Sequence, residues 1–387
     1  MKTVEHYVAQ AQEQTGLADL GDDDWRDGFE RLLDAFEGEA RLSEIGAAVV
    51  EADLVGYLMK RMSIVAWRKE HPEVARTPVT PPIVVIGQAR TGTTILHDLL
   101  AQDPASRVPL AWEVDFPVPP PETETYESDP RIEQTEAQQA MVDLVIPGFR
   151  KMHPVGARLA QECVRITGSA FRSMIFPTQY RVPSYGRWLL HEADMTPAYR
   201  WHRAYLQVLG SRHRGQRWVL KSPGHIWCLQ ALLAEYPDAV LVQTHRDPLK
   251  IIASVSSLMA LLRKLATDEP TMQECAEEFA EYILLGLDRS VDSREDGTVP
   301  ADRVVDVQFG EFMSDQIGAV RTVCERLGIE LRSGAEQRMR AFLDDNPQDK
   351  HGLHTYSFAD TGLDPDEIRS RARRYQEYFG VASEPVR

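Results

Sequence analysis

The sequence predicts an α/β protein with three layers, in which helices flank a central parallel sheet. Two observations indicate this fold. From residue 83 onward, short apolar runs alternate with helix-length segments, which is typical of βαβ units. The first run, residues 83–86, leads through a glycine-containing turn into a helical stretch, an order of elements suited to binding phosphate.

The segment before the sheet, residues 1–80, is expected to form a helical extension packed on the core. Its apolar residues recur at helical spacing in two stretches, Trp25, Phe29, Leu32, Leu33 and Phe36, and then Ile45, Val49, Ala52, Leu58 and Met62. A proline-rich linker at 77–82 follows these helices. We therefore place the start of the α/β domain at residue 81, so that it comprises residues 81–387.

The predicted strands are short and buried. They span residues 83–86, 218–220, 239–244 and 304–307, and the helices after them span about 93–101, 226–235, 249–265 and 312–327. The ligand of such a sheet is expected at the carboxyl ends of the strands, near a switch point in the strand order.

Two further helical regions complete the prediction. Between residues 117 and 215 the alternation stops, and we expect a helical insertion that includes a helix over 197–212 with Thr196 as its N-cap. An insertion of this length commonly builds a ligand pocket or a lid, and plain helical packing has equal weight. A last helix at 364–379 has Asp364 as its N-cap and Gly380 at its end.

Composition and charge exclude several classes of protein. The formal net charge of −16 argues against a general nucleic-acid-binding protein, whose surface is basic. There is no apolar run of 18 residues, so no transmembrane segment is expected, and the polar N-terminus does not resemble a secretory signal. The four cysteines lack C-x-x-C spacing, which predicts reduced thiols in a cytoplasmic protein without a zinc site. The oligomeric state stays open, with a homodimer as one option.

The turn after the first strand reads Gly87-Gln-Ala-Arg-Thr-Gly-Thr-Thr94, a phosphate-loop frame with one departure. Thr93 replaces the usual lysine, and the cation has moved inside the loop to Arg90. Because that lysine contacts the β- and γ-phosphates of a nucleoside triphosphate, the loop favours a different phosphorylated nucleotide. The fold is thus P-loop-like, and the expected phosphate ligands are Arg90, Thr91, Gly92, Thr93 and Thr94.

A second set of residues follows the strand at 239–244. Arg246 stands at the end of this strand, Asp247 and Pro248 open a helix, and Ser254 lies about two turns into it. Arg246 and Ser254 can hold one phosphate together. The alternative is that Arg246 pairs with a structural carboxylate and Ser254 only packs. Two phosphate sites at neighbouring strand ends predict a nucleotide with phosphates on both its 5′ and 3′ sides.

The combination of Arg-Thr-Gly-Thr-Thr at 90–94 with Arg246 and Ser254 resembles the sulfotransferases that use 3′-phosphoadenosine 5′-phosphosulfate (PAPS), in their bacterial branch. Residues 82–104, 220–223, 236–257 and 350–381 are also similar to that family. The resemblance implies transfer of a sulfuryl group from PAPS to a hydroxyl of a small-molecule, lipid or glycolipid acceptor. It implies release of adenosine 3′,5′-bisphosphate and no metal ion.

The resemblance also implies roles for single residues. Arg90 and Lys221 are candidates for stabilising charge on the sulfuryl group and the leaving phosphate. For the base that deprotonates the acceptor, Glu113 and His225 compete. Glu113 matches a catalytic glutamate about 20 residues after the loop arginine, whereas His225 lies farther from Lys221 than the histidine of animal enzymes does.

A late basic loop, with Lys350, Gly352 and Tyr356, is expected to close on the donor near its 3′-phosphate. His153 and Glu162 lie in the insertion and are candidates for contact with the acceptor. The alternative is that both are polar residues on the surface of helices. Two other functions stay open: an ATP-dependent kinase of a small alcohol, and a nucleotide-bisphosphate-binding protein without catalysis. The missing loop lysine argues against the first, and the set Arg90, Lys221 and Glu113 argues against the second.

Overall fold

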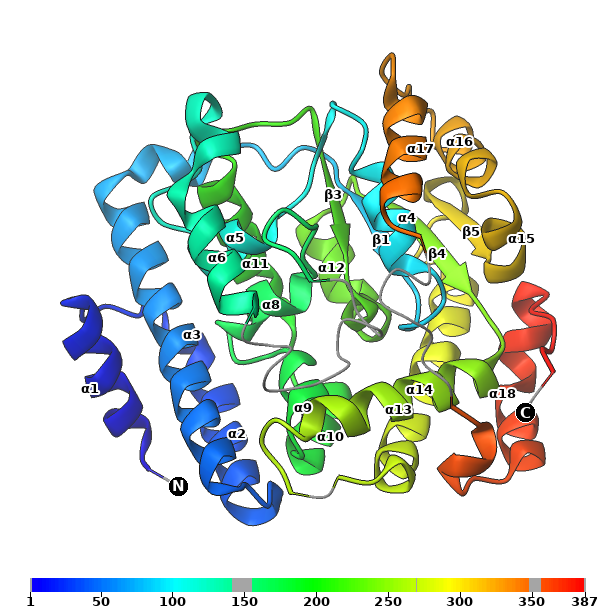
Figure 1. Ribbon diagram of the computed structural model, residues 1–387, viewed down its shortest axis with the longest axis horizontal. Helices are drawn as coiled ribbons and strands as arrows, with labels where there is room; N and C mark the ends of the chain where they lie inside the picture. Colours follow the sequence, from blue (N-terminus) through cyan, green and yellow to red (C-terminus); the bar gives the residue numbers. More distant parts are fainter. Residues whose placement is uncertain (1, 141–154, 269, 348–355, 386–387) are drawn as a thin grey trace.

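The structure is a computed structural model that describes residues 2–140, 155–268, 270–347 and 356–385. Its centre is a parallel sheet with the strand order β2-β3-β1-β4-β5. The strands are β1 (Ile83–Ile86), β2 (Ser106–Arg107), β3 (Arg217–Lys221), β4 (Val240–His245) and β5 (Val304–Gln308). Figure 1 shows β1 in the middle of the sheet, between β3 and β4. The predicted three-layer α/β fold is confirmed.

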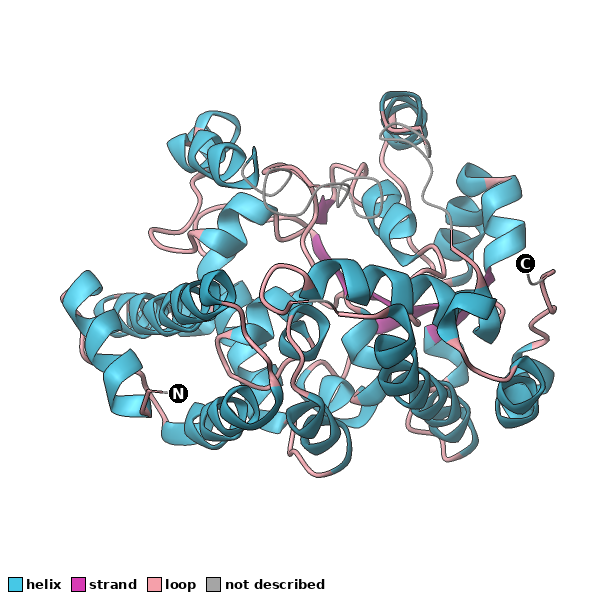
Figure 2. Cartoon of the chain, turned by 60° about the horizontal axis from the view of Figure 1, so that its bottom comes forward, coloured by secondary structure: helices cyan, strands magenta, loops and turns pink. Residues whose placement is uncertain are grey.

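Alternate side chains of β1 face opposite layers of helices. Ile83 and Val85 pack with one apolar cluster, and Val84 and Ile86 pack with another. The first layer is built by α4 (Thr93–Leu100), α16 (Gln316–Arg326) and α17 (Ala335–Asp345). The second is built mainly by α3 (Glu44–Glu70), α8 (Cys163–Gly168), α11 (Thr196–Leu209) and α12 (Leu229–Glu235). Figure 2 shows the strands as a small layer enclosed by helices.

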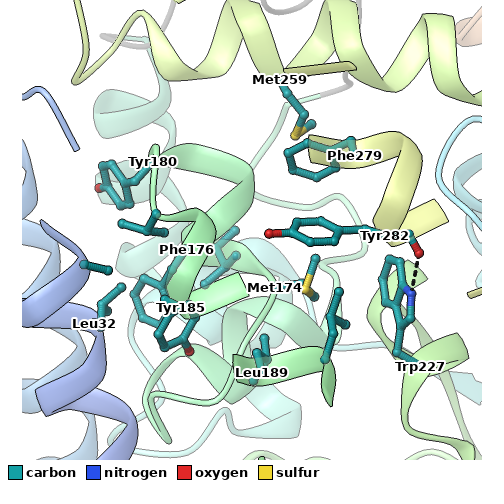
Figure 3. Close-up of a cluster of buried hydrophobic side chains, with 14 of the residues drawn as sticks. Leu32, Met174, Phe176, Tyr180, Tyr185, Leu189, Trp227, Met259, Phe279 and Tyr282 are labelled. Atoms are coloured by element: carbon teal, nitrogen blue, oxygen red, sulfur yellow. Dashed lines mark hydrogen bonds between the residues drawn. The ribbon is translucent and has the colours of Figure 1, made fainter. Parts of the chain in front are cut away.

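A third, larger cluster joins the N-terminal helices to the α/β domain. Trp25, Phe29 and Leu32 are buried against it, as their helical spacing predicts. Figure 3 shows this cluster, where Leu32 lies on the side of Phe176 and Tyr185, and Phe279 lies beyond them. The helices that supply it include α1 (Val4–Thr15), α2 (Arg26–Glu39), α9 (Ile175–Gln179), α10 (Pro183–His191), α13 (Pro248–Arg263), α14 (Met272–Glu295) and α18 (Pro365–Phe379).

The predicted buried face of the long helix α3 is wrong in its first turns. Ile45 is 69% exposed, whereas Gly46 is buried. A Cβ at Gly46 would lie 1.9 Å from the carbonyl oxygen of Ala266, so this helix faces the core with its smallest residue. Hydrophobicity alone does not reveal such a close backbone approach.

Two predicted boundaries also differ from the structure. Residues 312–327 do not form one helix, because Asp315 ends α15 (Phe309–Ser314) and caps α16 through the Gly318 N–H. Thr196 is the first residue of α11 and not its N-cap; its N–H donates instead to Asp194 Oδ1 at 2.9 Å. The caps predicted for α13 and α18, Asp247 and Asp364, are confirmed.

The described residues between β2 and β3 form mainly helices, in the region where the sequence predicted helical stretches. Besides α8 to α11 it contains α5 (Ala111–Asp115) and α6 (Pro130–Ala140). Short 3-10 turns occur at Asp23–Trp25, Pro72–Arg76, Thr123–Ser128, Pro223–Trp227, Ala301–Arg303 and Phe358–Thr361. Within the described residues, no helix combines the length and the apolar character needed to cross a bilayer. All four cysteines are free thiols, and three of them are buried.

Candidate active site

The loop after β1 packs tightly against the end of β4. Gly87 has φ +126°, and a Cβ there would lie 2.5 Å from Thr244 Oγ1 and 2.7 Å from the Thr244 carbonyl oxygen. Only glycine combines this backbone angle with this approach. The first glycine of the motif therefore fixes the loop against the neighbouring strand.

Two side-chain hydrogen bonds hold the loop in shape. Thr91 Oγ1 donates to the Gln88 carbonyl oxygen at 2.6 Å and lies 2.6 Å from Thr244 Oγ1. Arg90, the cation inside the loop, has a left-handed backbone with φ +70°. For a residue other than glycine this conformation costs about 1–3 kcal/mol, and it concentrates at functional sites.

Helix α4 begins at Thr93, directly after Gly92. The first amide groups of a helix have no acceptor within the helix, and they point toward its N-terminal end. Together with the positive end of the helix dipole they form a site for an anion. The predicted phosphate loop thus has the required strand before it and the required helix after it.

The two predicted phosphate sites are joined through Arg90. Its Nε donates to the buried Ser254 Oγ at 3.0 Å, and its carbonyl oxygen accepts from Arg246 Nη1 at 2.9 Å. Burial lowers the pKa of the Arg90 guanidinium, Tyr356 opposes this effect, and Arg246 adds to it. The structure therefore brings Arg90, Arg246, Ser254 and Tyr356 together at one edge of the sheet.

Arg246 already holds a carboxylate. Its Nε and Nη2 donate to the two carboxylate oxygens of Glu384 at 2.9 and 3.2 Å, and its Cζ lies 3.9 Å from the centroid of the Phe309 ring. The sequence predicted either a phosphate or a carboxylate partner for this arginine. In this structure the partner is a carboxylate from the end of the chain.

Lys221 stands at the end of β3, beside the loop helix. Its Nζ donates to Thr94 Oγ1 at 3.1 Å and forms an ion pair with the carboxylate of Glu162. The lysine side chain is 1% exposed and that of Glu162 is 19% exposed. A cation, a hydroxyl of the phosphate loop and a partly accessible carboxylate therefore meet at one point.

Glu113 lies elsewhere, in a fully buried ion pair. Its carboxylate binds the guanidinium of Arg107, with one contact at 2.9 Å, and accepts from the Leu110 N–H at 2.8 Å and from Tyr126 Oη at 3.2 Å. Arg107 also lies over the rings of Tyr126 and Trp218. These contacts fix the turn between β2 and α5, and they do not favour Glu113 as a base that meets a substrate.

His225 is buried and weakly basic. Burial lowers its pKa to about 3, and its Nδ1 lies 2.8 Å from Tyr199 Oη. Its Nε2 has no hydrogen-bond partner within the described part of the chain. The His225 side chain lines a cavity of about 20 Å³ together with Ser222 and Cys163. Ser222 directly follows Lys221, and Cys163 directly follows Glu162.

Some predicted residues fall outside the described ranges. These are Lys350, Gly352 and His153. The third residue of the late loop, Tyr356, is described and packs against the largest apolar cluster. In residues 2–140, 155–268, 270–347 and 356–385 no group of His, Cys, Asp and Glu is arranged to hold a metal ion.

Two contacts of the site were missed by the sequence reasoning, those of Glu162 and Glu384. Glu162 pairs with a lysine 59 positions away, and Glu384 with an arginine 138 positions away. Neither glutamate belongs to a local motif, so no spacing signal connects it to its partner. The sequence had indicated Glu162 only as a candidate for the acceptor side, without Lys221 as its partner.

Comparison with known proteins gives a consistent result. Residues 81–333 match the model of the Sulfotransferase family. The omega-hydroxy-beta-dihydromenaquinone-9 sulfotransferase Stf3 of Mycobacterium bovis is 26% identical over 286 residues, which is 70% of this chain and 69% of Stf3. Among solved structures, the sulfotransferase STF1 of Mycobacterium tuberculosis H37Rv is 33% identical, with a TM-score of 0.85 and coverage of 96% of this chain and 98% of STF1. STF9 of Mycobacterium avium is 30% identical, with a TM-score of 0.90 and coverage of 99% and 98%.

Proposed function

This chain belongs to the sulfotransferase family, and from that premise we propose that it transfers the sulfuryl group of PAPS to a hydroxyl of an apolar acceptor, releasing adenosine 3′,5′-bisphosphate. One observation carries the choice of donor. The loop at the start of α4 and the Arg246–Ser254 pair are linked through Arg90 into one anion-binding edge. A nucleotide with both a 5′-phosphosulfate and a 3′-phosphate suits two linked anion sites.

In this proposal the 5′-phosphosulfate lies on the amides of the loop and of α4. Arg90 and Lys221 supply the positive charge that neutralises the transferring group and the leaving phosphate oxygen. Thr94, which accepts from Lys221 at 3.1 Å, holds this ammonium against the loop. Thr91 and Gly92 keep the shape of the loop, and Thr93 starts its helix.

We propose Glu162 as the general base, in place of Glu113 and His225. Glu162 is the carboxylate in contact with Lys221, and it is partly accessible. It takes the proton of the acceptor hydroxyl while the oxygen bonds to sulfur and the bond from sulfur to the 5′-phosphate oxygen breaks. Glu113 is occupied by Arg107, and a histidine with a pKa of about 3 accepts a proton poorly near neutral pH.

The acceptor is proposed to be a lipid or another apolar molecule with a hydroxyl group. Apolar side chains of Val164, Met174, Leu189 and Met195 lie near Ser222 and His225, around a cavity of about 20 Å³ that has room for about one water molecule. All four belong to the helical insertion. The proposal rests on the relative Stf3, which is named as a sulfotransferase of a hydroxylated menaquinone derivative.

We also propose that the protein works in a reducing compartment such as the cytoplasm. Its four cysteines are free thiols, and burial raises the pKa of Cys163 and Cys228 to about 12. Such thiols are poorly reactive and are typical of proteins that need no disulfides.

A titration and a transfer assay test the proposed function. Calorimetry compares adenosine 3′,5′-bisphosphate with adenosine 5′-phosphate and with ATP plus Mg²⁺. The proposal requires tighter binding of the bisphosphate, with the preference reduced in Ser254→Ala, and transfer of ³⁵S from PAPS to a long-chain alcohol or hydroxylated quinone. Preference for ATP with acceptor-dependent ATP consumption would establish a kinase instead. Bisphosphate binding without turnover on any hydroxylated acceptor would leave a binding protein.

A further inference from the structure

The end of the chain is attached to the proposed 3′-phosphate site. After α18 the backbone folds back, so that Val381 is buried and Gln376 Nε2 donates to its carbonyl oxygen at 3.2 Å. The Glu384 N–H then donates to Asp247 Oδ2 at 2.5 Å. Asp247 is the buried N-cap of α13, and Arg369 of α18 donates to both its oxygens at 2.6 Å. This anchoring delivers the Glu384 side chain to one place.

That place is the guanidinium of Arg246. Glu384 binds it through both carboxylate oxygens, in the two-bond geometry with which an arginine also binds a phosphate. Arg246 Nη1 donates a hydrogen bond to the Arg90 carbonyl oxygen, and the Phe309 ring packs against the guanidinium. A phosphate that takes the Nε–Nη2 edge of Arg246 must therefore remove Glu384 from it.

The solvent exposure of Arg246 and Glu384 is consistent with an ion pair that can open and close. The Glu384 side chain is 32% exposed and that of Arg246 is 15% exposed. Water can therefore solvate the carboxylate after it leaves, which makes its loss far less costly than breaking a fully buried pair. The fully buried Arg107–Glu113 pair of the same protein shows the contrasting, permanent arrangement.

We propose that Glu384 is an intramolecular competitor of the 3′-phosphate of the donor and of the product, and so sets how tightly this site selects nucleotides with that phosphate. The inference rests on the proposed function, since it requires that a 3′-phosphate binds Arg246. The apparent dissociation constant of the bisphosphate equals its intrinsic value divided by the fraction of molecules in which Arg246 is released. A ligand without a 3′-phosphate does not compete with Glu384.

The test is calorimetric titration of the full chain with adenosine 3′,5′-bisphosphate and with adenosine 5′-phosphate. The variants are Glu384→Gln, a chain that ends at Ser383, and the matched control Glu377→Gln, which removes the same charge from an exposed glutamate of α18. We expect Glu384→Gln and the shortened chain to bind the bisphosphate about tenfold more tightly, or ~1.4 kcal/mol, and the 5′-phosphate within about twofold of the parent protein. Glu377→Gln should match the parent protein with both ligands.

Three outcomes separate the two proposals. Tighter bisphosphate binding in both Glu384 variants supports the competitor. If the parent protein prefers the bisphosphate and this preference is unchanged or weakened in both variants, the competitor proposal is overturned. The proposed function then stays intact, because Glu384 only orients Arg246 or has no effect on binding. Equal binding of the two ligands in the parent protein and in both variants removes the 3′-phosphate site, and the competitor with it.

Hydrogen exchange gives a second readout that a purely structural contact does not produce. Ligands generally increase protection of the amides they contact. The competitor predicts the reverse at the tail, where adenosine 3′,5′-bisphosphate should speed exchange of the Glu384 amide while it slows exchange in the loop at 87–94. Slower exchange of the Glu384 amide with bound bisphosphate would overturn the proposal.

Discussion

Replacement of Glu113 by glutamine tests the distinction between a structural and a catalytic carboxylate. The Glu113 side chain is completely buried, and it neutralises an Arg107 side chain that is 4% exposed. Glutamine keeps the shape and one acceptor oxygen for the Leu110 N–H, but it leaves the buried guanidinium without a counter-charge. Breaking one partner of a buried ion pair costs about 3–5 kcal/mol.

The effect on thermal stability follows from the size of the chain. With an unfolding entropy of about 2.1 cal/mol/K per residue, a chain of 387 residues loses about 5 °C in Tm for a loss of ~4 kcal/mol. Calorimetric melting at pH 7 measures this shift. Glu122→Gln is the matched control, because Glu122 pairs with Arg212 at the surface, where both side chains are 42% exposed or more. We expect it to lower the Tm by less than about 1 °C.

Turnover at a temperature where both proteins are folded completes this test. Glu113→Gln should retain kcat per folded molecule within about threefold, whereas Glu162→Gln should lose about 10²–10⁴-fold, as expected for a general base. The reasoning is refuted if Glu113→Gln melts like the parent protein but loses turnover by a hundredfold. Glu113, one of the two candidates that the family resemblance implied, would then be the base.

Three further predictions address the loop, the lysine and the buried histidines. Gly87→Ala should destabilise the protein by more than about 2 kcal/mol in urea unfolding and weaken nucleotide binding, whereas Gly56→Ala, in α3 with open space around it, should be neutral or slightly stabilising. Lys221→Met should lower kcat by about 10²–10³-fold, with donor affinity falling less; equal losses in both would contradict a role in the transition state. Burial lowers the pKa of His97, His202 and His225 to about 3. Between about pH 3 and pH 6.5 the unfolded chain therefore binds more protons than the folded protein. The free energy of unfolding should fall as the pH decreases through this range, by about 1.4 kcal/mol per pH unit for each histidine. His202→Asn should reduce the slope of unfolding free energy against pH by about 1.4 kcal/mol per pH unit, and an unchanged slope would show that His202 is not neutral in the folded state.

Local sequence signals were sufficient for four of the five strands and for the loop, whereas the two-residue strand β2 (Ser106–Arg107) was not predicted. The apolar runs at 83–86 and 239–244 and the glycine spacing after the first run depend on neighbours in the chain, so their periodicity is readable. The caps Asp247 and Asp364 act within two residues, as their hydrogen bonds to Leu249 and Asp366 show. These parts of the prediction are confirmed.

Local sequence signals do not predict contacts between segments that are distant in the chain. The partner of Glu113 is set by how β2 and α5 fold back on each other, and the partner of Lys221 by how the insertion returns to β3. Gly46 was passed over because a glycine carries no hydrophobic signal, although its backbone contacts Ala266. Each case depends on tertiary proximity, for which a single sequence contains no periodic trace.

The cluster that includes Trp25 and Phe29 has a practical consequence for handling the protein in pieces. The Phe29 ring centroid lies 4.4 Å from that of Phe171, and the amide backbone at Gly28 meets the Phe171 carbonyl so closely that a Cβ would clash at 2.1 Å. At the other end of the chain, Tyr375 Oη lies 3.0 Å from His245 Nδ1, next to Arg246. A fragment cut at the limits of the family match, 81–333, would therefore expose the inner surfaces that these two ends cover. Recombinant fragments with those limits are expected to aggregate, because they would expose a large apolar surface to water.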